Sequence, residues 1–226
     1  MDLSTTYAHV VPSETRATYH HGALRDELVA ACVALIETEG IGAVSLRRVA
    51  REAGVSPGAP YHHFADRSAL LTAISMQGYD LLTATLRTVK DSATTSAGAL
   101  RALVEAYVRF AAEHPAHVHL MLRPELAEPH KHPDAQAAGA AAIAILTEAV
   151  IDAQRDGTVA PGDPEPLVGL IWALAVGIVT LWLDGPLESR CAQLGTTPQQ
   201  LTADIGVLLE RLVLGAQSPP AVGKPR

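Results

Sequence analysis

The stretch Val44–Leu71, which reads VSLRRVAREAGVSPGAPYHHFADRSALL, decides how this chain folds. Its pattern predicts a helix over Leu46–Ala53, with Ser45 placed to accept a hydrogen bond from the first free backbone N–H groups. Gly54 follows at the point where helices commonly end on a residue with positive φ, a conformation that costs glycine little. The sequence therefore predicts a helix that stops in a tight turn.

A second, short helix is expected over Pro57–Phe64, with Ser56 as its N-cap and proline at its first position. Asp66 is placed to cap a long helix that follows. The small residues of the short helix allow its backbone to approach another surface closely, and its Tyr and His side chains carry neutral hydrogen-bonding groups. This arrangement is typical of a helix-turn-helix whose second helix enters the major groove of DNA.

Arginines flank the short helix on both sides and predict contacts to DNA phosphates, which position a protein but carry no sequence information. The side chains expected to face base edges are Pro57, Gly58, Ala59 and His62. Since this set lacks the Asn, Gln, Lys and Arg that make bidentate base contacts, we expect specificity to rely on thymine methyl groups, on Arg47 or Arg48, and on DNA shape. The DNA-binding candidates are Ser45, Arg47, Arg48, Ser56, Pro57, Gly58, Ala59, Tyr61, His62, His63 and Arg67.

At these positions the sequence resembles the TetR family of bacterial transcription regulators. The resemblance covers about the first third of the chain densely, and it implies an N-terminal three-helix DNA-binding domain followed by a helical domain that binds an effector and dimerises. Its partners would be double-stranded operator DNA, a small-molecule effector and a second copy of the chain. The residues that carry it are Ser45, Val49, Ala50, Ala53–Ser56, Tyr61–Phe64, Leu70, Leu71, Tyr19–Gly22 and Leu35–Gly40.

Composition also favours an all-α fold. Hydrophobic residues make up 48% of the 226 residues, which is enough for a sizeable core, and no alternating β-branched runs bounded by turns appear. The net charge of −7 argues against a protein that coats nucleic acid regardless of sequence, which would be basic throughout. Two cysteines far apart in sequence, Cys32 and Cys191, are typical of inert thiols in a reducing cytoplasm. The N-terminus lacks the pattern of a secretory signal.

The uncharged stretch Leu167–Leu183 raises the question of a membrane span. It is shorter than the roughly 20 residues that usually cross a bilayer, and no Lys/Arg cluster anchors either end. A helix that is apolar on every face can instead lie between its own domain and a partner subunit. We therefore expect a cytoplasmic protein without a membrane segment.

The expected organisation is a disordered arm (1–18), a helix-turn-helix domain (19–66), a helical effector-binding and dimerisation domain (67–216) and a disordered tail (217–226). A proline-rich connector over Arg123–Pro133 interrupts the second domain, and Thr197–Gln200 has the pattern of a capping box. The predicted helices span Ala23–Glu39, Leu46–Ala53, Pro57–Phe64, Asp66–Asp91, Ala97–Glu113, Ala116–Leu122, Asp134–Asp156 and Leu167–Leu183, with a last one from Thr197.

The C-terminal part resembles a TetR subgroup named for a Trp-His-Gly signature. Trp172 and Gly177 fit this signature, but Val176 stands where the histidine is expected, so a polar ligand contact is expected to be missing there. The resemblance implies that the last two helices form a four-helix bundle across the axis of a homodimer. The other matching phrases are His114–Ala116, Leu120–Met121 and Arg123–Leu126.

No pattern for catalysis is present: the chain has no nucleophile elbow, no phosphate-binding loop and no HExxH zinc motif, so we expect neither an enzyme nor a cofactor. The histidine pairs His117/His119 and His130/His132 have i, i+2 spacing, which diverges on a helix, and His114/His117 meets i, i+3 only across the break at Pro115. We therefore expect no metal site.

The resemblance implies a sequence-specific transcriptional regulator, most often a repressor, which a small and mostly apolar molecule releases from its operator. Two alternatives remain: a DNA-binding dimer with no effector, and a helical enzyme or carrier in which the N-terminal hairpin is structural. Core packing is an alternative role for each candidate ligand-binding residue. These candidates are Tyr107, Phe110, Met121, Trp172 and Trp182.

Overall fold

The computed structural model describes the backbone of residues 14–123 and 133–215. The first thirteen residues of the expected arm, most of the proline-rich connector and the C-terminal tail lie outside the described residues. The chain divides into two compact units, Met1–Leu70 and Leu71–Arg226, which we call unit 1 and unit 2. One helix, α3, runs through the division, because Leu70 is the last residue of unit 1 and Leu71 the first of unit 2.

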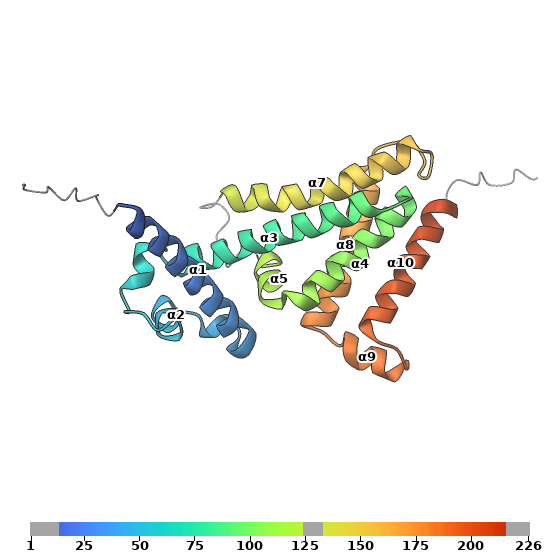
Figure 1. Ribbon diagram of the computed structural model, residues 1–226. Coiled ribbons are helices and arrows are strands. Elements are labelled where there is room, and N and C mark those ends of the chain that lie inside the picture. Colours follow the sequence, from blue (N-terminus) through green and yellow to red (C-terminus); the bar gives the residue numbers. More distant parts are fainter. Residues whose placement is uncertain (1–13, 124–132, 216–226) are drawn as a thin grey trace, which may run out of the picture. The chain divides into compact units, whose positions relative to one another are not determined.

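Every regular element in the described ranges is a helix, and the predicted all-α class is confirmed (Figure 1). Unit 1 contains the first four elements and the start of α3. The elements are α1 (Glu14–Glu39), η1 (Ile41–Ala43), α2 (Leu46–Glu52), η2 (Ala59–His62), α3 (Arg67–Ser92), α4 (Ser96–Glu113), α5 (Pro115–Met121), α7 (Pro133–Arg155), α8 (Glu165–Leu183), α9 (Leu187–Gln193) and α10 (Pro198–Gly215).

Local signals set the helix ends of unit 1 as predicted. The Ser45 hydroxyl accepts a hydrogen bond from the backbone N–H of Arg48 at 3.2 Å. Gly54 has φ of +69°, the left-handed conformation expected after α2. The Asp66 carboxylate accepts a hydrogen bond from the backbone N–H of Ala69 at 2.9 Å, and so caps α3. The hydrogen bonds to Ser45 and Asp66 each satisfy a helix-end N–H that has no partner within the helix.

The core of unit 1 forms where α1 packs against η1 and α2. The Arg25 guanidinium lies 5.5 Å above the ring of Phe64, a cation–π contact that covers the edge of this core. Burial raises the pKa of the Cys32 thiol to about 12, and nearby Arg67 opposes this rise, so the thiol stays protonated and inert. The fully buried side chains of unit 1 are Leu28, Cys32, Val49, Ala50 and Leu70.

The predicted α-helix over Pro57–Phe64 is wrong. The structure has a turn at Pro57 and Gly58 and then the short 3₁₀-helix η2, whose N-cap is Gly58 and not the expected Ser56. The second proline explains the difference, because Pro60 has no N–H to donate and disfavours α conformation in the residue before it. The Tyr61 N–H therefore bonds to the Gly58 carbonyl at 3.2 Å, with 3₁₀ spacing.

Arg67 fastens the loop before α2 to the first turn of α3. Its Nε donates to the carbonyl oxygen of Val44 at 2.9 Å, and its terminal nitrogen donates to that of Ile41 at 2.8 Å. The guanidinium is half-buried and donates to both carbonyls, and the Ile41 carbonyl also accepts from the Val44 N–H at 3.2 Å. A residue predicted to contact phosphate therefore has a structural role within unit 1.

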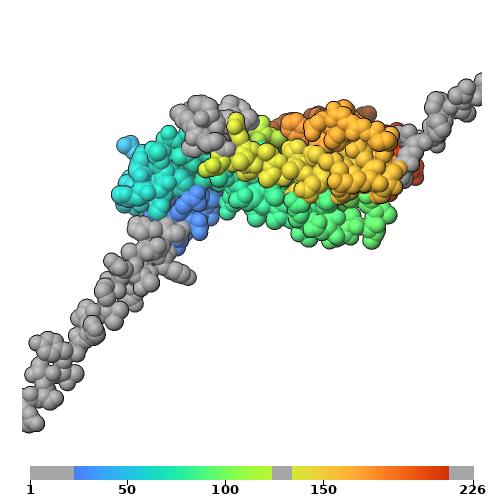
Figure 2. Space-filling view, turned by 90° about the horizontal axis from the view of Figure 1, so that it is seen from above, coloured from blue at the N-terminus to red at the C-terminus, as the bar shows by residue number. Residues whose placement is uncertain are grey.

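Unit 2 is built around α4, which packs against α7, α8 and α10. In the space-filling view α7 covers much of one face of this unit (Figure 2). Surface ion pairs join α3 to α7: Arg87 to Glu148 at 2.6 Å and Lys90 to Asp152 at 2.9 Å. Such exposed pairs contribute little, so the apolar core holds the unit together.

Two helices of unit 2, α7 and α8, are long and apolar enough to cross a membrane by length and composition alone. Both place side chains in the core of unit 2, including the fully buried Ile145 and Val150 of α7 and Val179 of α8. Their apolar character is therefore accounted for in part by packing within the unit.

Helix α1 begins at Glu14, nine residues before the predicted start at Ala23, and ends at Glu39 as predicted. The other helices agree with the predicted ranges to within two or three residues, with one omission. The sequence analysis missed α9, which is short and buries Leu187 and Cys191, a pair with i, i+4 spacing that was the available signal. At the start of α10 the Thr197 hydroxyl accepts from the Gln200 N–H at 3.1 Å, which is one of the two hydrogen bonds of the predicted capping box. The Gln200 side chain bonds Asp204 at 3.0 Å.

We expect Arg67→Met to loosen unit 1, since it removes the two hydrogen bonds that a charged donor makes to the carbonyls of Val44 and Ile41. The expected loss is about 2 kcal/mol, or roughly thirty-fold faster hydrogen exchange of the α2 amides. Hydrogen–deuterium exchange with mass spectrometry measures this. Arg47→Met, at an exposed position, is the matched control, and equal exchange in the two variants would contradict the structural role of Arg67.

Candidate functional site

The exposed turn of unit 1, residues 56–63, is the first candidate site. Tyr61 is 54% exposed, and His62 is exposed as well. The turn is held in place by its own Pro60 and by the adjacent Phe64, which are both buried. The predicted candidates Ser56, Pro57 and Gly58 are exposed, while Ala59 and His63 are partly exposed. The turn thus presents a continuous surface of small, aromatic and imidazole groups to solvent.

The predicted phosphate-binding arginines have different surroundings. Arg48 is bound by two carboxylates, Glu39 at 2.5 Å and Glu52 at 2.8 Å, and the hydrogen bond to Glu52 is the first cause of its raised pKa. Arg47 is exposed and makes no ion pair or hydrogen bond among the described residues. The Arg67 guanidinium is bound to two backbone carbonyls. Of the three predicted arginines, Arg47 therefore has the guanidinium that is most available to an anion.

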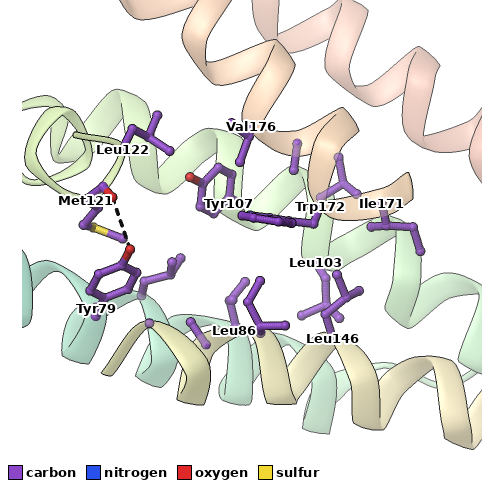
Figure 3. A pocket seen from close by; sticks show the side chains of 16 residues that line it. Tyr79, Leu86, Leu103, Tyr107, Met121, Leu122, Leu146, Ile171, Trp172 and Val176 are labelled. Carbon is purple, nitrogen blue, oxygen red and sulfur yellow. Dashed lines mark hydrogen bonds between the residues drawn. The ribbon is translucent and has the colours of Figure 1, made fainter. Parts of the chain in front are cut away.

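An apolar pocket of about 500 Å³ inside unit 2 is the second candidate site. In Figure 3 the side chains of five helices point into one space, with Tyr79 and Leu86 of α3 on one side and Tyr107 and Trp172 on the other. Its wall consists of Tyr79, Leu82, Leu86, Leu103, Val104, Tyr107, Met121, Leu122, Gly139, Ala142, Ile143, Leu146, Ile171, Trp172, Ala175 and Val176.

Three of the five predicted ligand-binding residues, Tyr107, Met121 and Trp172, line this pocket. The other two lie outside its wall. Phe110 is 2% exposed and packs against the His114 ring at 4.7 Å. The Trp182 indole N–H donates to Glu188 at 3.1 Å.

Val176 lines the pocket with an apolar side chain at the position where the sequence analysis expected a histidine. Sequence reasoning missed Tyr79 and the aliphatic residues of the wall, because their helical spacing looks the same whether they face a core or a void. The signal that could have found Tyr79 is a tyrosine among the leucines of one helix face.

Helix α5 contacts α3 closely beside the pocket. A Cβ added to Gly78 would lie 2.7 Å from the Met121 sulfur and 2.9 Å from the His117 Cβ, so only glycine allows this approach. The Tyr79 hydroxyl donates to the Met121 carbonyl at 3.2 Å (Figure 3). Since Met121 also lines the pocket, a molecule bound there would touch the α5–α3 contact directly.

His117 is the buried polar residue of this contact, with 7% exposure. Its Nε2–H donates to the Gln77 side-chain oxygen at 3.2 Å, and its Nδ1 is buried without a hydrogen-bond partner. The His114 ring lies 5.7 Å away in an edge-on arrangement. Burial lowers the pKa of His117, and the neighbouring His114 acts in the same direction, so His117 is neutral in the folded protein at neutral pH.

The other end of α5 is joined to the C-terminus of α8. The Asp184 carboxylate binds His119 at 2.9 Å and Arg123 at 3.1 Å. Within the described residues no cluster of three or more His, Cys, Asp or Glu side chains could hold a metal ion, and His130 and His132 lie outside those residues. Helix α5 thus connects α3 with α8 through named side-chain contacts.

Two family profiles match this chain. Residues 28–74 match "Bacterial regulatory proteins, tetR family", and residues 100–204 match "Tetracyclin repressor-like, C-terminal domain". The two profiles cover the exposed turn and most of the pocket wall. No curated protein sequence matches the chain at a significant level.

Solved structures with the same fold include three informative cases. A protein of unknown function from Rhodococcus sp. RHA1 is 34% identical, with a TM-score of 0.70 over 85% of this chain and 96% of that one. The TetR family transcriptional regulator PfmR from Thermus thermophilus is 19% identical, with a TM-score of 0.66 over 81% and 97%. A regulatory protein of the tetR family from Rhodococcus RHA1 is 22% identical, with a TM-score of 0.67 over 84% and 96%.

We expect the stability of unit 2 to fall as pH decreases from the usual histidine pKa of about 6.5. Below that pH the unfolded chain binds a proton on His117 while the folded protein, with its lowered pKa, does not. The stability is complete above this pH and is lost progressively toward the lower folded pKa. Urea unfolding followed by circular dichroism between about pH 5 and about pH 8, on either side of that value, measures the effect.

His117→Gln should flatten this pH dependence, whereas His62→Gln, which changes an exposed histidine of unit 1, should leave it unchanged. A pH profile that is the same in wild type and His117→Gln would contradict the assignment to the buried imidazole.

Proposed function

This chain belongs to the TetR family of bacterial regulatory proteins, and on that premise we propose that it is a sequence-specific repressor of transcription that an apolar small molecule releases from its operator. The single observation that carries the DNA-binding part is the exposed turn 56–63, held outward by buried Pro60 and Phe64. Regulators of this family typically lack enzymatic activity and are typically cytoplasmic, and we propose both for this chain.

The turn supports binding in a DNA groove by its size and chemistry. Pro57 and Gly58 let the backbone approach the base edges, while Tyr61 and His62 add hydrogen-bonding groups. Arg47 forms no ion pair among the described residues, so its guanidinium can bind a phosphate. Arg48 would have to leave Glu39 and Glu52 before it could contact DNA, so we assign it a smaller part in binding than Arg47.

A homodimer would supply the twofold symmetry that a palindromic operator requires. Helices α8 and α10 both present large apolar side chains to solvent, including Leu170 at 60% exposure and Leu212 at 64%. Exposed apolar surface of this kind marks an interaction site. The further exposed side chains on these helices are Trp172, Leu181 and Leu208.

The effector response would pass through α5. A molecule in the pocket contacts Met121, and Met121 packs on Gly78 of α3, the helix whose first turn is part of unit 1. Displacement of α5 would therefore bias the tilt of α3, and a coupling of roughly 1–3 kcal/mol is usual for such regulation.

Selection from a random duplex library, followed by fluorescence anisotropy with the selected duplex, tests the DNA-binding proposal. We expect an enriched motif with twofold symmetry. Arg47→Ala should weaken binding by about tenfold and reduce the salt slope by about 1, as loss of one phosphate contact requires. Arg48→Ala should weaken binding less. Failure to enrich any motif would contradict the proposal, and a larger loss for Arg48→Ala would contradict the assigned roles.

The double variant Leu170→Glu, Leu212→Glu should be a monomer, because charges in the proposed interface cannot be desolvated without partners. Sedimentation analysis should then give the chain mass of 23.7 kDa, against twice that mass for wild type. Leu81→Glu, at an exposed leucine of α3, is the matched control and should remain dimeric. A wild-type monomer, or a dimer that survives the double substitution, would contradict the proposed interface.

A further inference from the structure

The wall of the pocket carries no charged side chain among the described residues. Its side-chain hydrogen-bonding groups are the hydroxyls of Tyr79 and Tyr107 and the indole N–H of Trp172, and the remaining lining is aliphatic apart from glycine and methionine. The chemistry of a bound molecule is therefore set by three neutral polar groups in a hydrocarbon surface.

The two tyrosines differ in what they can offer a ligand. The Tyr79 hydroxyl already donates its hydrogen to the Met121 carbonyl. The Tyr107 hydroxyl makes no hydrogen bond among the described residues, although its side chain is half-buried. Burial raises the pKa of both phenols, and for Tyr107 the neighbouring Tyr79 adds to the rise, so both stay neutral. Tyr107 thus has a free O–H donor beside the pocket space.

No Arg or Lys among the described residues lines the pocket. Arg87 and Lys90 of α3 and Arg123 after α5 lie outside the wall, and each is paired with a carboxylate. A carboxylate ligand in this pocket would lose its hydration without gaining a counter-charge, which costs several kcal/mol. A carbonyl or ether oxygen needs only one donor, and Tyr107 provides it.

We propose that the pocket takes an uncharged, mainly hydrocarbon molecule with a single carbonyl, ester or ether oxygen that accepts a hydrogen bond from the Tyr107 hydroxyl. The inference rests on the proposed function only in taking this pocket as the effector site. A volume of about 500 Å³ lies within the usual range of roughly 300–1,000 Å³ for small-molecule pockets.

Three probes with matched hydrocarbon chains separate the possibilities. Methyl nonyl ketone carries the carbonyl, decanoate replaces the ketone methyl by a charged oxygen, and undecane removes the carbonyl. Fluorescence of Trp172 reports binding in a Trp182→Phe background, because Trp182 bonds Glu188 outside the wall. The ketone should bind at least about tenfold more tightly than decanoate at neutral pH.

Tyr107→Phe should weaken ketone binding by about fivefold and leave undecane binding unchanged, as loss of one neutral hydrogen bond requires. Tyr79→Phe is the matched control: the hydrogen of this hydroxyl is donated to the Met121 carbonyl, so any effect of the substitution should be the same for the ketone and for undecane. Equal effects of Tyr107→Phe on ketone and undecane would overturn the assigned hydrogen bond.

Decanoate binding as tight as that of the ketone would overturn the proposal of an uncharged ligand, and so would the failure of both the ketone and undecane to bind. Binding of the selected duplex is measured on the same preparations. If the duplex binds and the ketone does not, the inference about the ligand fails while the DNA-binding proposal stands. If no duplex binds, the proposed function fails whatever the probes do.

Discussion

The two hydrogen bonds from Arg67 to the carbonyls of Val44 and Ile41 are the constraint on which unit 1 depends. They join the loop before α2 to the first turn of α3, and so fix the start of a helix that continues into unit 2. One side chain can bond both carbonyls because the planar guanidinium offers several donors in a fixed geometry. The exposed turn 56–63 lies in the chain between these anchored segments, so its outward placement follows from them.

In unit 2, helix α3 forms part of the pocket wall. There α3 supplies Tyr79 and two leucines to an apolar pocket and accepts α5 against Gly78. The pocket and the α5–α3 contact share Met121, so a ligand cannot fill the pocket without touching that contact. Because the pocket wall carries no charged side chain among the described residues, we infer that the pocket selects by shape and by one neutral donor, without charge attraction.

Local signals in the sequence predicted the local structure well. The caps at Ser45, Asp66 and Thr197 and the positive φ of Gly54 depend on residues a few positions away, and each is present. The prediction of a helix over Pro57–Phe64 was wrong because Pro60 has no N–H to donate and disfavours α conformation in the residue before it. The short helix α9 was not predicted, because two apolar residues are too weak a signal for a helix.

Contacts between distant residues could not be read from the sequence. The partners of Arg67 lie twenty-three and twenty-six positions away, so nothing local distinguished this arginine from Arg47. Arg48 has one distant partner, Glu39, and one local partner, Glu52 at i+4, which was the available signal. The pocket wall was predicted only in part, for a related reason: which apolar residues face a cavity depends on how the helices pack, and only three of the five candidates line it. As the helices pack, Phe110 is buried in the core, and the Trp182 indole N–H donates a hydrogen bond to the Glu188 carboxylate.

In the proposed function, the exposed turn of unit 1 contacts the bases of a specific duplex. Photocrosslinking from position 61, with benzoylphenylalanine in place of Tyr61, tests it most directly, with the same group placed at exposed Leu81 as the control. We predict a crosslink from position 61 to a base within the selected motif and none from position 81. A crosslink from position 81 alone, or a bound duplex with no crosslink from position 61, would contradict the account.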